Sequence, residues 1–242
     1  MDKKRIINTL GKIVGGTKNE SIRNEWLAHT LQKIPAGLTI LDAGAGECQF
    51  QKYCLHLKYI SQDFGKYTGG GDVGIHTGSW DNSKLDIVSD ITEIPLPDNS
   101  VDAVMCTEVF EHIPNPILAI KEFARLVKPG GYLVLTAPFA SLVHFAPYHF
   151  YSGFSRYFYE KYLPEYGFHI EDMQFNGNFF EYLSQEILRI DFCRKKYTKK
   201  RLNILEKGLL VLVLLLLRKF SKSDKGSSEI LCYGLHVFAR KK

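Results

Sequence analysis

The chain has 242 residues, of which 45% are hydrophobic and 24% charged, and its 31 basic residues exceed its 26 acidic residues by five. This average composition excludes a disordered, collagen-like or coiled-coil chain and leaves enough apolar material for a sizeable core. Five cysteines form no Cys-x-x-Cys pair, which favours reduced thiols in a cytoplasmic protein. The basic N-terminal segment has too short and broken an apolar run for a secretory signal.

Hydrophobic periodicity in the first half alternates between helix-like and strand-like segments. Helices are expected over 21–34, 47–57 and 116–126. Strands are expected within 38–47 and over 59–63, 85–90, 101–109 and 132–137. The six glycines of residues 64–85 mark a long loop, read as a mobile lid over the acceptor. Strands separated by helices predict an α/β fold of the Rossmann-like, doubly wound kind, with helices on both faces of a mostly parallel sheet.

The second half of the chain differs in composition, because aromatic residues are dense between Phe139 and Phe180. The expected elements there are a strand over 169–175, helices over 179–197 and 202–220, and a last strand over 230–241 that completes a seven-stranded sheet. We therefore predict a single domain over 1–242, with a cofactor-binding half at about 21–138 and an elaborated acceptor side at about 139–229.

A strand followed by Asp42-Ala-Gly44-Ala-Gly46 places a backbone without side chains where a ligand can approach closely. A dinucleotide fingerprint would have its third glycine at Gln49, so that interpretation is incomplete. The carboxylate of Asp42 would repel a pyrophosphate but could pair with an ammonium group. Asp63, at the end of the next strand, is placed to accept hydrogen bonds from ribose hydroxyls, and Asp90 ends the third strand at the same edge.

Five segments, in order, resemble the motifs of class I S-adenosylmethionine-dependent methyltransferases, in particular the type-11 group. They are LDAGAGE, SQDF, SDI, SVDAVMCTEVFEHIPNP and RLVKPGGYLVLTAPF. The resemblance covers roughly Trp26 to Phe175, and the terminal YGLHVFARK is similar to that fold's last strand. The sequence departs from the commonest pattern at Cys48, where a third glycine is usual, which puts the geometry of the turn in question.

The resemblance implies S-adenosyl-L-methionine as the cofactor and a role for each matching position. Gly44, Ala45 and Gly46 would wrap the methionine portion and ribose, with Asp42 near the amino group. Asp63 would bind the ribose hydroxyls. The positions expected against the adenine ring and beneath the sulfonium methyl are Phe64, Asp90 and Ile91 for the ring, and Cys106, Thr107 and Glu108 for the methyl.

Three histidines are candidate bases for the acceptor, namely His112, His144 and His149. Ordering a loop or packing in the core is the alternative for each of them. The spacing of His, Cys, Asp and Glu residues indicates no metal-ligand pattern, so the sequence predicts no metal.

Residues Leu209–Leu217 are all Leu or Val, and six basic residues stand at 194–201. Nine apolar residues are about half of the roughly 20 that cross a bilayer as a helix. The segment 194–220 therefore fits either a peripheral contact with an anionic membrane or a helix that is buried or forms a homodimer. Apolarity on every side favours the buried or dimeric helix, because an interfacial helix should keep a polar face.

The function expected from these features is methyl transfer to a small-molecule acceptor such as a sugar, a lipid-linked glycan or a related metabolite. A nucleic-acid partner is not expected, since few basic residues interleave the aromatics of 145–166. The alternatives are an RNA or protein methyltransferase, and a catalytically silent binding module. The expected location is cytoplasmic, or peripheral at the inner membrane face if 194–220 contacts lipid.

Overall fold

The computed structural model describes residues 16–242, which divide into two compact units. The sheet unit comprises residues 24–174 and 234–242, and the helical unit comprises residues 16–23 and 175–233. The sequence predicts one domain whose character changes near residue 139. The aromatic segment after residue 139 instead stays with the sheet unit, and the division falls at Phe175.

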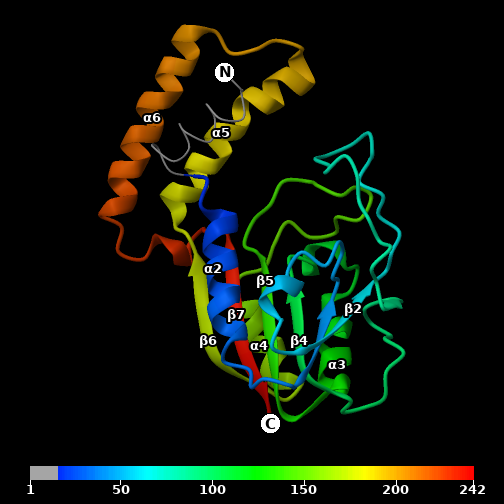
Figure 1. The fold of residues 1–242 in the computed structure, drawn as a ribbon. Coiled ribbons are helices and arrows are strands. Elements are labelled where there is room, and N and C mark those ends of the chain that lie inside the picture. Colours follow the sequence, from blue (N-terminus) through cyan, green and yellow to red (C-terminus); the bar gives the residue numbers. More distant parts are fainter. Residues whose placement is uncertain (1–15) are drawn as a thin grey trace. The chain divides into compact units, whose positions relative to one another are not determined.

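Seven strands form one sheet in the order β3-β2-β1-β4-β5-β7-β6 (Figure 1). Strands β1 to β5 pair in parallel, and β7 runs antiparallel to β5, which confirms the predicted Rossmann-like, mostly parallel sheet. The strands are β1 (Thr39–Ala43), β2 (Lys58–Asp63), β3 (Ile87–Val88), β4 (Val101–Thr107), β5 (Val127–Pro138), β6 (Phe168–Asn176) and β7 (Gly234–Lys241).

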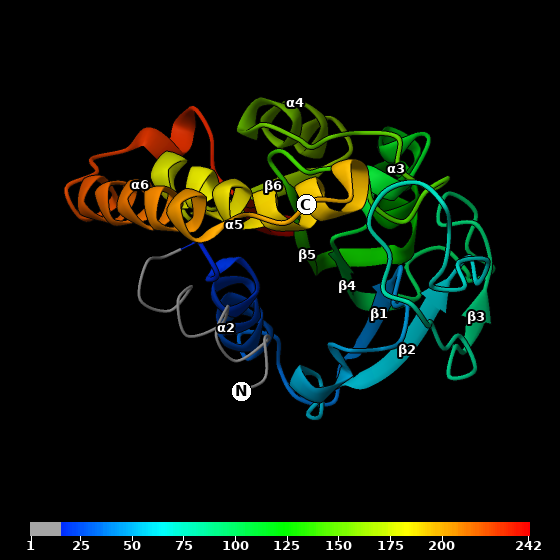
Figure 2. The same cartoon turned by 90° about the horizontal axis from the view of Figure 1, so that it is seen from above.

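Helices lie on both faces of the sheet. Figure 2 shows α3 (Pro116–Leu126) and α4 (Arg156–Glu165) on one face, with α2 (Asn19–Leu31) on the other. Ile40 packs with Leu27 of α2 in a buried cluster, and successive strand residues point to opposite faces, so the fully buried Leu41 faces the other layer. Each such buried side chain contributes roughly 1.5–3 kcal/mol to folding.

Two predicted elements are shortened in the structure, and one observed helix is not predicted. The helix expected over 47–57 is reduced to a 3-10 turn at Gln51–Tyr53, because the backbone φ of Cys48 is 58°, a left-handed angle that an α-helix does not tolerate. The strand expected over 85–90 shortens to β3. In the aromatic segment the helix α4 forms, although the sequence periodicity indicates none there.

The helical unit contains α5 (Phe179–Thr198) and α6 (Ile204–Lys222), close to the two predicted helices, and they lie side by side in Figure 1. Asn203 caps α6 by accepting a hydrogen bond from the Glu206 N–H at 2.9 Å, and the Glu206 carboxylate accepts the Asn203 N–H at 2.7 Å. This capping box starts α6 two residues later than the apolar pattern predicts.

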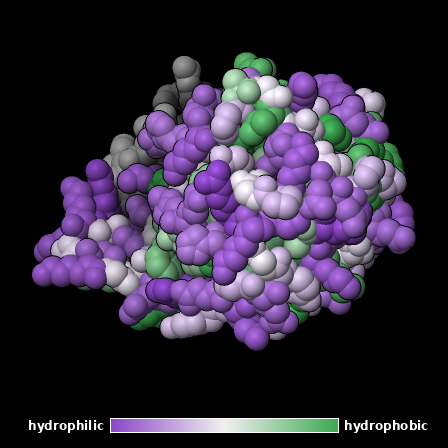
Figure 3. Space-filling model, turned by 90° about the horizontal axis from the view of Figure 1, so that it is seen from below, coloured by the Kyte–Doolittle hydropathy of each residue, from purple (hydrophilic) through white to green (hydrophobic). Residues whose placement is uncertain are grey.

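The sheet also fixes where a ligand can bind. The strand order reverses between β1 and β4, and in open α/β sheets ligands occupy the crevice at the carboxyl ends of the strands beside such a reversal. The loops that follow β2 and β5 lie at this edge (Figure 1). The opposite edge, where the parallel strands begin, is seen in Figure 3 and is largely hydrophilic, with apolar side chains only in small patches.

Candidate cofactor and acceptor site

The turn after β1 needs glycine at two positions. Gly44 has a φ of 80° and Gly46 a φ of 52°, both in the left-handed region that side chains disfavour. A Cβ atom at Gly44 would lie 2.5 Å from the Val109 side chain, and one at Gly46 would lie 2.5 Å from the ring of Trp80. Glycine at these positions therefore allows the left-handed backbone angles of the turn and also allows Val109 and Trp80 to pack against it.

Cys48 stands where a third glycine is usual in the family pattern, and its φ of 58° is the angle that a glycine would adopt easily. A residue with a Cβ pays roughly 1–2 kcal/mol for this conformation. The turn thus follows a left-handed path at Cys48 despite the missing glycine, which answers the question that the sequence leaves open about its geometry.

Asp63 at the end of β2 holds the turn in place. Its Oδ2 accepts the Gly46 N–H at 3.1 Å and its Oδ1 accepts the Gly65 N–H at 2.9 Å. Burial raises the pKa of this carboxyl, although the backbone hydrogen bonds act in the opposite direction. An ionised carboxylate offers about four lone-pair sites, so sites remain on Asp63 for two further donors such as vicinal hydroxyls.

Asp42 is placed differently from the expectation of an ammonium partner. It is only 1% exposed, and its Oδ2 accepts the hydroxyl of Tyr59 at 2.5 Å, which links β1 to β2. Burial, supported by the nearby charge of Asp63, raises the pKa of Asp42 to about 7 against the opposing hydrogen bond from Tyr59. The carboxylate therefore offers a ligand little direct access.

The positions expected along the adenine ring lie at the same edge. Ile91 is 9% exposed, and the exposed Asp90 uses its Oδ1 to accept both the N–H and the hydroxyl of Thr92, at 2.8 and 2.7 Å. The ring of Phe64 meets Tyr148 edge-on, with centroids 4.8 Å apart. Phe64 is thus held by the aromatic segment that follows β5.

The three positions at the end of β4 differ in access. Cys106 is fully buried, and burial raises the pKa of its thiol, so this residue presents no surface to a ligand. Thr107 is buried with a hydroxyl oxygen that has no hydrogen-bond partner. Glu108 has a φ of 56°, and its Oε1 accepts the Thr136 hydroxyl at 2.9 Å. A strained residue beside an unpartnered polar group is typical of a functional site.

The glycine-rich loop, expected to be a mobile lid, is held by the segment that follows β5. The Ile75 N–H donates to the Val143 carbonyl at 3.1 Å, and the Phe145 N–H donates to the Ile75 carbonyl at 3.0 Å. Tyr67 stacks on Phe145 with centroids 4.4 Å apart, and Trp80 meets both rings edge-on at 5.3 Å. Trp80, which sequence reasoning misses, therefore connects this aromatic cluster to Gly46.

The structure brings the three candidate histidines together. His112 and His144 have ring centroids 4.6 Å apart, and His149 lies 4.8 Å from His144. Burial, together with the charge of His144, lowers the pKa of His112 to about 3, which makes it a poor proton acceptor. Burial opposes charge on His144 as well, but the adjacent Glu111 outweighs it and raises the pKa of His144.

Glu111 is the second residue that sequence reasoning misses. It is 1% exposed, and its backbone carbonyl accepts the N–H groups of Phe150 and Tyr151 at 2.8 and 3.2 Å. The signal available in the sequence is its position directly before the candidate base His112 in EVFEHIP.

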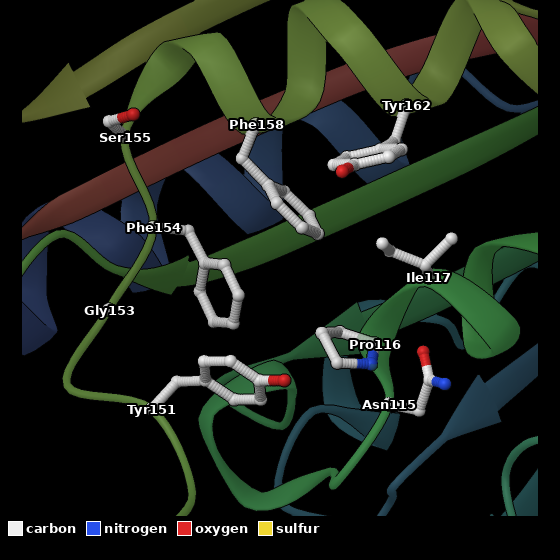
Figure 4. Close-up of a pocket in the computed structure, with 9 residues that line it drawn as sticks. All are labelled: Asn115, Pro116, Ile117, Tyr151, Gly153, Phe154, Ser155, Phe158 and Tyr162. Carbon is white, nitrogen blue, oxygen red and sulfur yellow. The ribbon is translucent and has the colours of Figure 1, made fainter.

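An open groove of about 400 Å³ is lined by residues that come shortly after Glu111 and the three histidines in the sequence. Figure 4 shows the rings of the 151–158 region facing Pro116 and Ile117 at the start of α3. The Tyr151 hydroxyl donates to the Pro114 carbonyl at 3.1 Å and fixes one wall. The aromatic residues that line the groove are Tyr151, Phe154, Phe158 and Tyr162.

Comparison with known proteins agrees with this geometry. The sequence model of a family described as a methyltransferase domain matches residues 41–135, which run from β1 into β5. Residues 41–135 therefore carry a methyltransferase domain of the class I S-adenosylmethionine-dependent family. This methyltransferase is 51% identical over 35 residues to a ubiquinone biosynthesis O-methyltransferase of Alkalilimnicola ehrlichii, a match that covers 14% of each chain.

Solved structures resemble this methyltransferase over nearly its whole length. An S-adenosylmethionine-dependent methyltransferase from Archaeoglobus fulgidus is 17% identical, with a TM-score of 0.56, and the alignment covers 91% of this chain and 94% of that one. Phosphoethanolamine N-methyltransferase 2 of Haemonchus contortus, solved with S-adenosyl-L-methionine, is also 17% identical, with a TM-score of 0.51 and coverage of 91% and 52%. At these identities the likeness shows the fold.

The cofactor of this family, S-adenosylmethionine, fits the residues present. Gly44 and Gly46 add no side chains of their own to the turn, and Asp63 keeps lone pairs for two hydroxyl donors. The unpartnered hydroxyl of Thr107 adds a polar group at the end of the neighbouring strand. These residues would hold the cofactor in the methyltransferase.

Proposed function

We propose that this methyltransferase transfers the methyl group of S-adenosylmethionine to a small-molecule acceptor, such as a sugar, a lipid-linked glycan or a related biosynthetic metabolite. The aromatic groove carries the proposal, since its volume of about 400 Å³ falls in the range of small-molecule sites. Its four rings suit an acceptor with one apolar face. The similarity to ubiquinone biosynthesis O-methyltransferases supports an oxygen atom as the methylated position.

S-adenosylmethionine supplies a methyl group on a positively charged sulfur, which is already a strong electrophile. The protein then needs to orient the reactants and exclude water. Asp63 orients the cofactor's hydroxyls through a carboxylate fixed by two backbone N–H groups. Trp80, Tyr67 and Phe145 form an apolar cover beside the glycine turn.

Asp63→Ala tests the cofactor site. The variant loses an acceptor of charge-assisted hydrogen bonds, each worth about 1.5–3 kcal/mol, so we expect the affinity for S-adenosylmethionine to fall by about tenfold or more. Asp72→Ala, which removes an exposed carboxylate from the neighbouring loop, should bind as the wild type does. Titration calorimetry measures both, with circular dichroism as the folding check. Unchanged binding in a folded Asp63→Ala variant contradicts the site.

A radiolabelled methyl donor distinguishes the acceptor classes. We expect label to enter small molecules when the enzyme is incubated with activated sugars or a metabolite extract. Label recovered in nuclease-sensitive or protease-sensitive material would instead identify an RNA or protein methyltransferase. Cofactor binding without turnover on any acceptor would identify a silent binding module.

We also propose that α6 contacts an anionic membrane surface. An apolar stripe of Leu205, Leu209, Leu212 and Leu216 is 82, 62, 61 and 53% exposed, whereas Leu214 and Leu217 are buried. Basic residues stand in the last turns of both α5 and α6. Two copies joined along this stripe would bring like charges together, whereas anionic lipid complements them at roughly 1 kcal/mol per residue. No helix within residues 16–242 is long and apolar enough to cross a membrane.

A further inference from the structure

The histidine cluster is built as ligand sites are built. The Nδ1 of His112 lies 2.5 Å from the Tyr148 carbonyl oxygen, and the Nδ1 of His144 lies 2.8 Å from the Leu142 carbonyl oxygen. A carbonyl only accepts hydrogen bonds, so both Nδ1 atoms carry the proton and both rings present Nε2 to the interior of the cluster. Metal-binding histidines are commonly oriented by such a bond from the second nitrogen.

The charges inside the cluster require a cation. The Oε1 atom of Glu111 lies 3.7 Å from the Nε2 of His112 and 3.7 Å from the Nε2 of His144. Neutral rings with protonated Nδ1 atoms would turn two nitrogen lone pairs toward a carboxylate that is 1% exposed. That arrangement is unfavourable unless a proton or a metal ion lies between the groups.

Two unpartnered groups distinguish a metal ion from a single proton. Both ring nitrogens of His149 are buried and have no hydrogen-bond partner, and the same holds for the Oε2 of Glu111. A proton shared between His144 and Glu111 would leave all of these buried atoms unsatisfied, which is unfavourable. One ion coordinated by the cluster would bind one nitrogen of His149 and the Oε2 of Glu111 at the same time.

We propose that His112, His144 and His149, with Glu111, bind one divalent transition-metal ion such as Zn²⁺. One ligand nitrogen from each histidine lies within 4.8 Å of the others, so side-chain adjustment brings them around a single ion. Three imidazoles and a carboxylate suit Zn²⁺ and its first-row neighbours, whereas Mg²⁺ prefers an all-oxygen shell.

The proposed ligands come from two segments of the chain that meet at the carboxyl edge of the sheet. Glu111 and His112 belong to the 3-10 turn Phe110–His112 that follows β4, and the other two histidines lie in the segment after β5. The Phe145 ring stacks on His112 with centroids 5.1 Å apart and planes inclined by 15°, which limits rotation of that ring. The ion would therefore join the segment that carries the aromatic groove to the end of β4.

The metal would also supply what the histidines alone do not. A bound divalent ion lowers the pKa of a coordinated hydroxyl, which an imidazole ring by itself does not do. This role, activation of an acceptor oxygen, rests on the proposed function. Metal binding itself does not depend on it and can be measured with no acceptor present.

Titration calorimetry with Zn²⁺ alone tests the site on the tag-free, full-length chain after chelator treatment. We expect one high-affinity ion per chain. His149→Ala should weaken binding by more than the roughly 10–100-fold that loss of a group hydrogen-bonded to a ligand costs, because it removes a ligand itself. His169→Ala, which removes an exposed histidine of β6, is the matched control and should bind as the wild type does.

Glu111→Gln gives a second variant, because it keeps the shape of the side chain while removing its charge. We expect weaker Zn²⁺ binding and a changed visible spectrum when Co²⁺ replaces Zn²⁺. The proposal is wrong if the wild type binds no Zn²⁺, or if folded His149→Ala and Glu111→Gln both bind it as tightly as His169→Ala does. If the protein binds Zn²⁺ but methylates no acceptor, the metal site is supported and the proposed function is wrong.

Discussion

At the scale of single residues, Asp42 shows how burial changes the meaning of a motif. The carboxylate that the family pattern places near an ammonium group is 1% exposed and joined to Tyr59 at 2.5 Å. Its pKa of about 7 means that the folded protein retains a proton which an unfolded chain loses near pH 4. Asp42 therefore links the stability of the fold to pH.

The contribution of Asp42 makes the fold less stable as the pH rises. Between pH 4 and 7 the native state binds more protons than the unfolded state at Asp42, so the free energy of unfolding falls as pH rises, by at most about 1.4 kcal/mol per pH unit. Asp42→Asn keeps an acceptor for Tyr59 but lacks this titration. We expect the variant to gain stability relative to the wild type as pH increases from 4.5 to 7.5.

Urea unfolding at three pH values measures the difference, with Asp72→Asn as a control for loss of an exposed carboxylate. Stability curves of Asp42→Asn and the wild type that stay parallel across this range would contradict the expectation.

Residue-scale features divide clearly into those that the sequence predicts and those that it does not. The position of Asp63 at the end of β2 is predictable, because the strand pattern over 59–63 ends on this carboxylate. The accessibility of Asp42 and Cys106 is not predictable, since it depends on packing that no local pattern encodes. The histidine cluster depends on two separate segments meeting, and Glu111 gains its meaning only when both are in place.

At the scale of elements, the glycine-rich loop is fixed by a few contacts rather than left free. A Cβ at Gly74 would lie 2.8 Å from the Val143 carbonyl oxygen, while a Cβ at Gly78 would meet nothing within 4 Å. Both glycines have a left-handed φ, 86° and 98°. Alanine at either position would have the same unfavourable backbone angle, but only at Gly74 would its Cβ also collide with the Val143 carbonyl oxygen.

This pair gives a matched test of the loop's attachment. We expect Gly74→Ala to separate the loop from the segment after β5 and to expose Trp80, and Gly78→Ala to leave that contact intact. Trp26→Phe removes the other tryptophan, so acrylamide quenching of fluorescence reports Trp80 alone. Equal quenching in the two variants would contradict the role of the Gly74 contact.

Element prediction succeeds where hydrophobic periodicity is long and fails where a single backbone angle decides. The helices α3, α5 and α6 fall close to their expected ranges, since each contains a long segment rich in apolar residues without a Pro in its interior. The helix expected over 47–57 fails because Cys48 adopts a left-handed angle that hydrophobic spacing does not report. The helix α4 forms where none is predicted, because aromatic residues on several of its sides hide the helical repeat of the apolar positions.

At the scale of the whole molecule, α6 shows that an apolar run need not be buried by its own chain. The all-round apolarity of Leu209–Leu217 favours burial, yet only Leu214 and Leu217 in that run are buried. Sequence reasoning predicts the helix but cannot predict its surroundings, because a helix pair offers α6 only one packed side. The exposed stripe is left for a membrane or for a second copy of the chain.

Leu212→Glu separates these two partners. Burying a leucine contributes about 1.5–3 kcal/mol, so we expect the variant to lose about tenfold or more in affinity for vesicles rich in phosphatidylserine. Leu55→Glu, at a leucine of the sheet unit that is 85% exposed, should sediment with vesicles as the wild type does. Wild type that forms dimers and ignores vesicles, with a monomeric Leu212→Glu, would overturn the membrane contact.

The antiparallel strand β7 has a consequence for how the protein is made. It lies between β5 and β6 in the sheet, yet in the sequence it follows the entire segment 175–233. Leu133 pairs with Ala239, so this contact closes a very long loop, which slows folding. A ribosome delivers both long helices before the sheet can close. Until β7 is synthesised, β5 and β6 each have an edge without a hydrogen-bonded neighbour. Such an unpaired edge can aggregate with other chains, and chaperones protect nascent chains in this condition.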